Sequence, residues 1–504
     1  MCLVNGPGDG AFRASLRAYE RWSGGVLGAQ EVLGKALARS MEESRGVLKS
    51  SVQAPPPQSL LRTGDLARSW WFGWSWATLA AGDRLGRSGG LTAPAPSPRT
   101  LALATVALEL YLGYAALRER ERWTPALVDA ADWELLHRRG AGRTLDAAQS
   151  LGGVLIKAAQ FASTRPDLLP DAYVRTLSAL QDRVEPRPWT VVGETIAREL
   201  GAPPAQVFPE LDERPVAAAS IAQVHRARLG DGREVAIKAQ YPGIGGLVEE
   251  DLSALEKIFE TISRFEPDLR LTPITNYLRW TLPLELDFER EAYAMTSLGE
   301  ALSHRDDVVV PRPVQELTTE RLLVMEYVAG VKITDRDALL AAGISPREVA
   351  ELLNDVFAES LFERGVLHAD PHPGNLQVQP GPRLVLLDHG LTLELEKPFV
   401  EALAKMVAAL REWDLDALAH SLREAGMPVG PDTDLDTLLG LIGVLLGGEK
   451  SEAGLGELGR SLGESVGDVP PKLLLVGRAI GLLDGITRQL DPELDALEVV
   501  ARRL

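Results

Sequence analysis

Hydrophobic and polar positions change their spacing twice along this chain. From about Trp123 to Glu210 the apolar residues recur at helical spacing, with prolines interrupting the pattern at "RPDLLPD" and "VEPRPW". After Glu210 come short runs typical of strands, "AAASIAQVHRARL" and "REVAIKAQ", and the "GDG" between them predicts a hairpin. "ERLLVMEYVAG" predicts one more strand, and from about Ser345 the pattern is mostly helical again. Strands followed by helices predict a two-lobed α+β domain.

Two N-terminal stretches indicate a membrane. The apolar run from Leu101 to Leu117 would make a helix of about 25 Å, shorter than a hydrocarbon core of about 30 Å. Glu109 lies at its centre, and we expect "RERER" to end it, so a buried or membrane-resting helix is favoured over a spanning one. Tryptophans crowd "SWWFGWSW" at 69–76 between arginines, which favours a lipid headgroup boundary. The alternative is an aromatic cluster packed on the catalytic body.

Length and charge narrow the class of protein. The 504 residues suffice for two or three domains, and the net charge of −18 argues against general nucleic-acid binding. Residues 1–100 carry a net charge of +5 and the remainder −23, which fits targeting or a membrane surface. Cys2 is the only cysteine, so no intrachain disulfide forms. Three early arginines are typical of a mitochondrial presequence, but four glutamates among the first 43 residues are not.

The stretch "GVLHADPHPGNLQV" carries the densest candidate chemistry. His368 and His372 are four residues apart, a spacing that binds metal when both lie on one helical face. Prolines flank His372 on both sides, so this stretch is predicted to be an irregular loop. Asn375 follows Asp370 by five residues, the interval of a kinase catalytic loop.

The other parts of a phosphoryl-transfer site occur in kinase order. Lys238 in "VAIK" lies on the strand after the hairpin, where an ammonium reaches nucleotide phosphates. In "LVLLDHG", Asp388 ends an apolar strand, a place from which a carboxylate can bind a metal ion. Chance capping and turn residues would have to reproduce all these intervals together. We therefore interpret the loop at 370–375 as catalytic.

The expected phosphate-binding loop is unusual. "PVAAAS" at 215–220 has alanines where a kinase has glycines. Alanine does not readily adopt the positive φ angles open to glycine, so this loop should be stiffer and close less easily over phosphates.

With these motifs the chain resembles the UbiB/ADCK (aarF-domain) family of atypical kinases, from about Trp123 to the C-terminus. The resemblance implies an α+β, protein-kinase-like bilobal fold, with a small antiparallel β lobe, a helical lobe and extra N-terminal helices. It also implies ATP and Mg²⁺ as cofactors. By this resemblance the catalytic residues are Asp370, Lys238 and Glu291, the ion-pair partner of Lys238; the nucleotide residues are Ala217, Ala218, Ala219, Ser220, Lys238, Glu326 and Val328; and the metal ligands are Asn375 and Asp388.

The resemblance further implies a gate over the active site. The family's Lys-x-Gly-Gln signature matches "KAAQ", which gives Lys157 and Gln160, and its Glu-x-Asp helix matches "LELDFEREA", which gives Glu285 and Asp287. These helices are expected to fill the space where a protein substrate would bind. Ala159 replaces the signature glycine, and alanine favours a helix by about 1 kcal/mol, so we expect the occluding arrangement to survive.

We expect four regions: 1–122 for targeting or membrane association, 123–210 as a helical extension, 211–330 as the smaller lobe with an inserted helix, and 331–504 as the helical lobe. The implied function is an ATPase or highly selective kinase supporting isoprenoid-quinone metabolism, of the ubiquinone or plastoquinone type, at a membrane. Expected partners are anionic lipid and quinone-pathway lipids or enzymes, with a homodimer left open and no nucleic acid. Expected locations are the mitochondrion or plastid of a eukaryote, or the cytoplasmic face of a bacterial inner membrane.

Two other functions stay open at this point. One is a small-molecule phosphotransferase of the aminoglycoside or choline kinase type, whose catalytic loop also has the pattern His-x-Asp-x-x-x-x-Asn. The "KAAQ" and "LELDFEREA" segments count against this function. A non-catalytic scaffold that senses nucleotide and binds lipid is the other.

Overall fold

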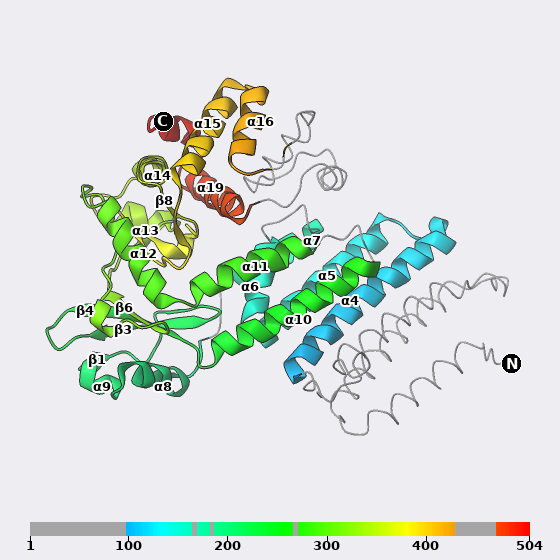
Figure 1. Cartoon of the computed structure of the whole chain (residues 1–504), viewed down its shortest axis with the longest axis horizontal. Coiled ribbons are helices and arrows are strands. Elements are labelled where there is room, and N and C mark those ends of the chain that lie inside the picture. The colour runs from blue at the N-terminus through cyan, green and yellow to red at the C-terminus, as the bar shows by residue number, and fades with distance from the viewer. Residues whose placement is uncertain (1–96, 164–168, 182–185, 266–270, 428, 430–469) are drawn as a thin grey trace. The chain divides into compact units, whose positions relative to one another are not determined.

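A computed structural model describes residues 97–163, 169–181, 186–265, 271–427, 429 and 470–504 (Figure 1). The chain divides into two compact units. One comprises the residues up to Leu151 together with Ser253–Pro267, and the other comprises Gly152–Leu252 and Asp268–Leu504. The tryptophan-rich stretch at 69–76 and the apolar run at 438–446 lie outside the described residues.

The described part of the first unit is helical. Helix α4 spans Pro98–Trp123, and the Ser97 hydroxyl caps it by accepting from the N–H of Thr100. The helix does not end at "RERER", as expected, but continues through it. Arginine and glutamate are good helix formers, and the chain leaves the helix only where Pro125 follows Thr124.

Helix α5, Ala130–Leu151, packs against α4. The Arg143 guanidinium lies 2.7 Å from the Glu109 carboxylate, which neutralises the charge in the middle of the apolar stretch of α4. Within the part of the chain described, α4 is the one helix long and apolar enough to cross a membrane, and 28% of its most apolar window is buried. Length and composition thus permit a membrane span without requiring one.

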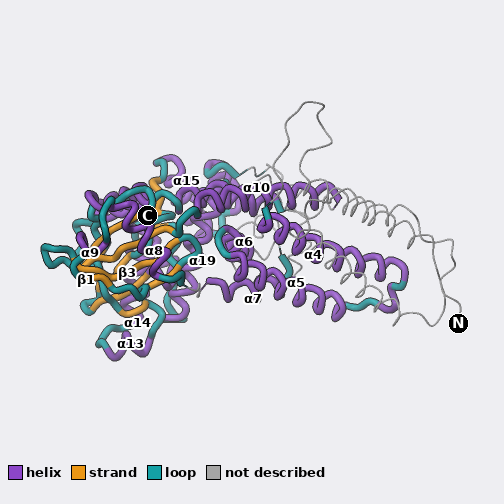
Figure 2. Tube along the Cα trace, turned by 90° about the horizontal axis from the view of Figure 1, so that it is seen from below, coloured by secondary structure: helices purple, strands orange, loops and turns teal. Residues whose placement is uncertain are grey.

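The smaller lobe of the second unit is an antiparallel sheet, and Figure 2 labels its strands β1 and β3 among the orange strands. The predicted hairpin is confirmed: β3 and β4 pair from Ala222↔Gln240 to Arg228↔Glu234, and Gly232 has a φ of 91° in the turn. The order is β1-β3-β4-β6, with β2 pairing β3. The strands are β1 Glu210–Leu211, β2 Ala217–Ala218, β3 Ala222–Arg228, β4 Glu234–Gln240 and β6 Leu322–Glu326.

Helices surround this sheet. Helix α8 packs on β4 and β6, and α12 packs on β6. Helix α6 packs on α7 and on α11, so the "KAAQ" segment and the "LELD" segment lie on neighbouring helices. The bounds are α6 Val154–Ser163, α7 Asp171–Leu177, α8 Trp189–Leu200, α9 Pro204–Val207, α10 Ile244–Phe265, α11 Thr272–Glu285 and α12 Phe288–Ala301.

The larger lobe is built on helix α14 and two small sheets. One sheet has the order β5-β10-β9-β7 and the other pairs β8 with β11. A buried core joins α14, β9, β10 and α19 through residues such as Val349, Leu376, Leu384 and Ile486. The elements are β5 Val308–Val309, β7 Val331–Lys332, α13 Arg336–Ala341, α14 Pro346–Ala358, β8 Val366–His368, β9 Leu376–Gln379, β10 Arg383–Leu386, β11 Thr392–Glu394, α15 Lys397–Glu412, α16 Leu415–Glu424, α19 Pro471–Leu490 and α20 Ala496–Ala501.

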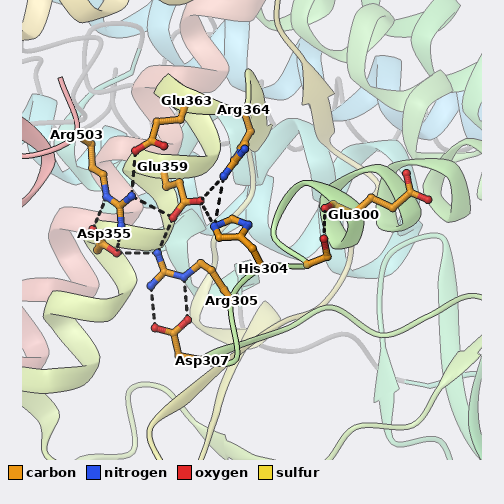
Figure 3. Close-up of polar contacts among 10 residues, drawn as sticks. Glu300, His304, Arg305, Asp307, Asp355, Glu359, Glu363, Arg364 and Arg503 are labelled. Carbon is orange, nitrogen blue, oxygen red and sulfur yellow. Dashed lines mark hydrogen bonds and ion pairs between the residues drawn. The ribbon is translucent and has the colours of Figure 1, made fainter.

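An ionic cluster ties the end of the chain to this lobe (Figure 3). Arg503, just after α20, lies 2.7 Å from Asp355 of α14 and 3.2 Å from the buried Glu359 carboxylate. Arg305, in the loop after α12, contacts the same two carboxylates, each at 2.7 Å. Because several charges share partners here, the cluster can hold α20 and the α12 loop on α14 better than an isolated surface pair could.

Candidate active site

At the centre of the site, an ion pair between Lys238 and Glu291 joins strand β4 to helix α12. The Lys238 ammonium donates to both Glu291 oxygens, at 2.8 and 2.9 Å, and to Asp388 Oδ1 at 3.1 Å. Asp287 caps α12 by accepting from the N–H of Arg290, which places Glu291 in the first turn of the helix. The Glu291 side chain is only 1% exposed. The structure thus brings three of the expected site residues into hydrogen-bond contact.

Burial and charge act against each other in this ion pair. Burial raises the pKa of Glu291 to about 7, although the adjacent Lys238 ammonium favours ionisation. Burial alone would lower the pKa of Lys238, but the carboxylates of Asp388 and Glu291 outweigh it and raise that pKa. Lys238 is therefore a fixed cation, held where a phosphate could replace one of its carboxylate partners.

Asp388 has an unusual backbone. Its φ is 55°, one of two positive φ values at non-glycine residues in the described chain. Burial opposes its ionisation, yet the Lys238 ammonium lowers the pKa of Asp388 well below its usual range. The lowered pKa keeps this carboxylate charged, and its side chain is 44% exposed, so it is also accessible from solvent.

The loop at 370–375 comes directly after β8. The side-chain amide of Asn375 donates to the carbonyl of Asp370 at 3.1 Å, and the N–H of Leu387 donates to the carbonyl of Asn375 at 2.8 Å. These bonds hold the two expected metal ligands, Asn375 and Asp388, on adjoining segments. The expected irregular loop is confirmed, with a single 3₁₀ turn at Pro373–Asn375.

The donor set at this site fits Mg²⁺. Since the Asn375 amide nitrogen donates to Asp370, its amide oxygen remains available as a metal ligand, as does the accessible Asp388 carboxylate on the adjoining segment. Mg²⁺ is usually held by one or two carboxylates together with substrate phosphates, and not by an all-protein cage. The described residues contain no group of three His, Cys, Asp or Glu side chains arranged for a metal.

The two histidines of the loop do not form a metal pair. The buried His368 ring donates from Nε2 to the carbonyl of Leu387 at 3.0 Å. His372 instead accepts the N–H of Gly374 through Nδ1 at 3.2 Å. Each imidazole therefore supports the loop backbone.

Three side chains that sequence reasoning missed lie next to Asp370 or support its partner: Arg478, Tyr277 and Phe161. Arg478 of α19 donates to Asp370 Oδ1 at 2.8 Å and to the Tyr277 hydroxyl of α11 at 2.8 Å. The Tyr277 ring stacks on Phe161 of α6, with ring centroids 3.8 Å apart. Burial alone would lower the pKa of Arg478, but Asp370 and Tyr277 raise it. An arginine inside the otherwise uncharged "LLLVGRAIGLL" was the one signal that could have found this contact.

The expected gate residues separate into two groups. Lys157 of α6 pairs with Glu285 of α11 at 2.8 Å. Gln160 does not join this pair, because its amide donates to the carbonyl of Leu180 at 2.9 Å. Asp287 does not join it either, since it caps α12. Of the expected gate residues, only Lys157 and Glu285 thus link α6 to α11, beside the stacking of Phe161 on Tyr277.

The expected nucleotide residues lie on β2 and after β6. Ala217 and Ala218 form β2 and pair with Val224 and Gln223, while Ala219 N–H donates to the carbonyl of Ala222 in the turn before β3. Ser220 is buried, and its hydroxyl has no hydrogen-bond partner among the described residues.

Glu326 and Val328 differ as hinge candidates. The Glu326 N–H donates to the carbonyl of Arg312 at 2.9 Å, so that donor is already used. The backbone of Val328 makes no hydrogen bond within the described part of the chain. Of the two residues, Val328 thus has the backbone groups better able to meet an adenine edge.

Comparisons with known proteins find a matching domain family, relatives in sequence and a solved structure with partial similarity. The model of the ABC1 atypical kinase-like domain matches residues 179–422. AarF domain-containing protein kinase 1 of Xenopus tropicalis is 36% identical over 52% of this chain and 51% of its own length. The uncharacterized protein slr0889 of Synechocystis is 34% identical over 56% of this chain and 72% of its own length. The structure of Rv3197 with erythromycin from Mycobacterium tuberculosis aligns over 72% of this chain and 94% of its own, with 23% identity and a TM-score of 0.47.

The chain spans about half the length of the Xenopus relatives it matches. The relatives named as kinases also include a probable serine/threonine-protein kinase of Dictyostelium discoideum, 33% identical. The expected bilobal α+β kinase-like fold and the expected family are confirmed by the matched domain together with the observed lobes. This chain belongs to the UbiB/ADCK (aarF-domain) family of atypical kinases.

Proposed function

We propose that this chain is a gated, Mg²⁺-dependent ATPase or highly selective kinase that supports isoprenoid-quinone metabolism at a membrane. The observation that carries the nucleotide part is the contact of one buried ammonium, that of Lys238, with both Glu291 and Asp388. Lys238 would bind phosphates, and Asp388 with Asn375 would hold Mg²⁺, which neutralises charge on the phosphates when bound. Asp370 would accept a proton from the attacking hydroxyl or water.

Gating is supported by the groups around Asp370. Arg478 already occupies one oxygen of that carboxylate, and Tyr277 holds Arg478 from α11. The same helix α11 is bound to α6 through Lys157 and Glu285. A protein substrate could reach Asp370 only if these helices moved apart, whereas a water molecule is small enough to reach it without that movement. The arrangement therefore favours slow ATP hydrolysis over general protein phosphorylation.

The quinone and membrane parts of the proposal are supported by the family and by α4, whose length and apolar composition suit a bilayer. Anionic lipid would be the partner surface. Association with lipid would place α4 and the basic residues before it at the membrane.

Asp388→Asn tests the nucleotide site. This substitution keeps the size of the side chain and removes the charge that Mg²⁺ needs, so we expect Mg²⁺-dependent ATP binding to be lost while the thermal midpoint stays near that of the unsubstituted protein. Isothermal titration with and without Mg²⁺ measures this. Equal Mg²⁺-dependent affinity in both proteins would remove Asp388 from the site.

A nucleotide-sensing scaffold is the second candidate, and the Arg478–Asp370 contact favours it because it occupies the catalytic carboxylate. Asp370→Asn separates the two functions in cells. Full complementation by this variant would favour the scaffold, and loss of complementation with normal protein levels would favour the enzyme.

A further inference from the structure

The first turn of α12 grips the segment that follows Asp388. Arg290 donates from Nη1 to the carbonyl of Gly390 at 2.8 Å and from Nη2 to the carbonyl of Thr392 at 2.9 Å. One residue further along the helix, Glu291 accepts the N–H of His389 at 3.2 Å. Two adjacent side chains of one helix thus fix three backbone groups of the segment 389–392.

This segment needs such restraint, because Asp388 has left-handed backbone geometry, with a φ of 55°. A non-glycine residue stays in that region only when its surroundings over-determine it. The carboxylate of Asp388 contacts the N–H of Gly390 at 3.3 Å and Lys238 at 3.1 Å. Lys238, however, is the cation that the proposed function assigns to phosphates. The side-chain restraint that does not involve Lys238 comes from α12, beside the backbone pairing of β11 with β8.

We propose that Arg290 is a positioning residue for Asp388, and that its guanidinium clamps the carbonyls of Gly390 and Thr392 so that the Asp388 carboxylate is aimed for Mg²⁺. This inference rests on the proposed Mg²⁺-nucleotide function. A guanidinium is a planar fork that reaches two acceptors at a fixed spacing, whereas a lysine ammonium is a single point of charge. The clamp therefore requires arginine and not merely a cation.

Arg290 had no role in the sequence motifs. It stands between Glu289 and Glu291, where an arginine on an acidic helix looks like one more solvated charge. In the structure it is partly buried and spans 100 residues of sequence to reach Gly390. The carbonyl of Gly390 belongs to the turn that connects Asp388 to β11, and that of Thr392 to the first residue of β11, so the clamp also joins α12 to that strand.

The first test compares binding of a fluorescent ATP analogue during Mg²⁺ titration in the full chain, Arg290→Ala, Arg290→Lys and Arg279→Ala. Arg279 is an exposed arginine of α11 that pairs with Glu249, and it serves as the matched control. Loss of a residue that orients a metal ligand typically weakens metal binding by about 10- to 100-fold, and we expect a rise of that size in half-saturating Mg²⁺ for Arg290→Ala. Arg290→Lys should recover little of it. Analogue binding without Mg²⁺ and the thermal midpoint should stay close to those of Arg279→Ala.

The second readout is amide hydrogen exchange in a peptide covering residues 386–394, without metal or nucleotide. Arg290→Ala should speed exchange at His389 and Thr392, whose N–H groups bond to Glu291 and to the carbonyl of His389. Three results would each overturn the clamp. One is unchanged exchange in Arg290→Ala, and another is a half-saturating Mg²⁺ concentration in Arg290→Lys equal to that of the unsubstituted protein. The third is analogue binding that Arg290→Ala weakens equally with and without Mg²⁺. If the unsubstituted protein itself shows no Mg²⁺-dependent binding, the proposed function fails, and the exchange comparison still decides whether Arg290 restrains the segment.

Discussion

At the scale of single residues, His389 stands out because a polar ring occupies the middle of the "DHG" triplet, where phenylalanine is commoner. The ring is fully buried, donates from Nε2 to the carbonyl of Leu386 at 3.0 Å and lies 3.3 Å from the Thr392 hydroxyl through Nδ1. It packs edge-on against His368, with ring centroids 5.1 Å apart. Burial, with a smaller effect from His368, lowers the pKa of His389 to about 3. The imidazole is therefore neutral at pH 7.

This lowered pKa predicts loss of stability in acid. The unfolded chain would bind a proton near pH 6.5 and the folded chain only near pH 3, so the free energy of unfolding falls as pH drops between these values. The slope from this one group is at most about 1.4 kcal/mol per pH unit. His389→Phe should remove it. The variant should be less stable at pH 7, by about 1–3 kcal/mol, because the carbonyl of Leu386 loses its donor.

Calorimetric thermal midpoints at pH 7, 6 and 5 measure the effect, with the gap between the two proteins expected to narrow toward acid. His420→Gln is the control for loss of an imidazole, since that histidine is largely exposed. A gap that stays constant across this range would show that His389 does not carry the acid sensitivity.

At the scale of elements, the parts that could be predicted are those whose signal is local in sequence. The hairpin of β3 and β4, the irregular loop at 370–375 and the apolar strand before Asp388 each carry their pattern within one short stretch of the chain. The Arg478–Asp370 contact could not be predicted in this way, because 108 residues separate the partners. Asp287 shows another limit. Its sequence spacing suits both a gate carboxylate and a helix cap, and only the structure shows that it caps α12.

The contact between α6 and α11 leads to a prediction about the gate. Lys157 and Glu285 are both largely shielded from solvent, and burial would lower the pKa of Lys157 if Glu285 did not raise it. Lys157→Ala leaves the Glu285 carboxylate without its cation, which should destabilise the arrangement in which α6 packs on α11 by about 3 kcal/mol or more. We expect faster basal ATP hydrolysis and weaker stimulation by lipid, with unchanged Mg²⁺ dependence.

Steady-state hydrolysis with and without anionic liposomes measures both quantities. Glu285→Gln should act in the same direction, and the double variant should not add to either single one, because both remove the same contact. Arg279→Ala, on the outer side of α11, is the matched control. Basal hydrolysis that falls in both single variants would mean that the pair supports the site and does not gate it.

At the scale of the whole molecule, the excess of basic residues and the one described helix long and apolar enough to cross a membrane both lie toward the N-terminus. Residues 1–100 are net basic while the chain as a whole carries −18, and α4 begins at the end of this basic range, at Pro98. Cationic residues near an anionic bilayer contribute about 1 kcal/mol each, and salt screens them over about 10 Å. Apolar insertion by α4 would resist salt. Membrane binding should therefore have one component that salt removes and another that it does not.

Deleting residues 1–96, which ends before the α4 cap at Ser97, separates the two components. In flotation with phosphatidylglycerol liposomes, the full chain should float at low salt and partly at high salt. The shortened chain should lose the salt-sensitive part and keep a smaller, salt-resistant part from α4. Neutral phosphatidylcholine liposomes are the control, and they should bind both chains through the salt-resistant part alone. Equal flotation of the two chains on anionic liposomes at both salt concentrations would move the electrostatic contact from the basic N-terminal segment to the kinase-like body.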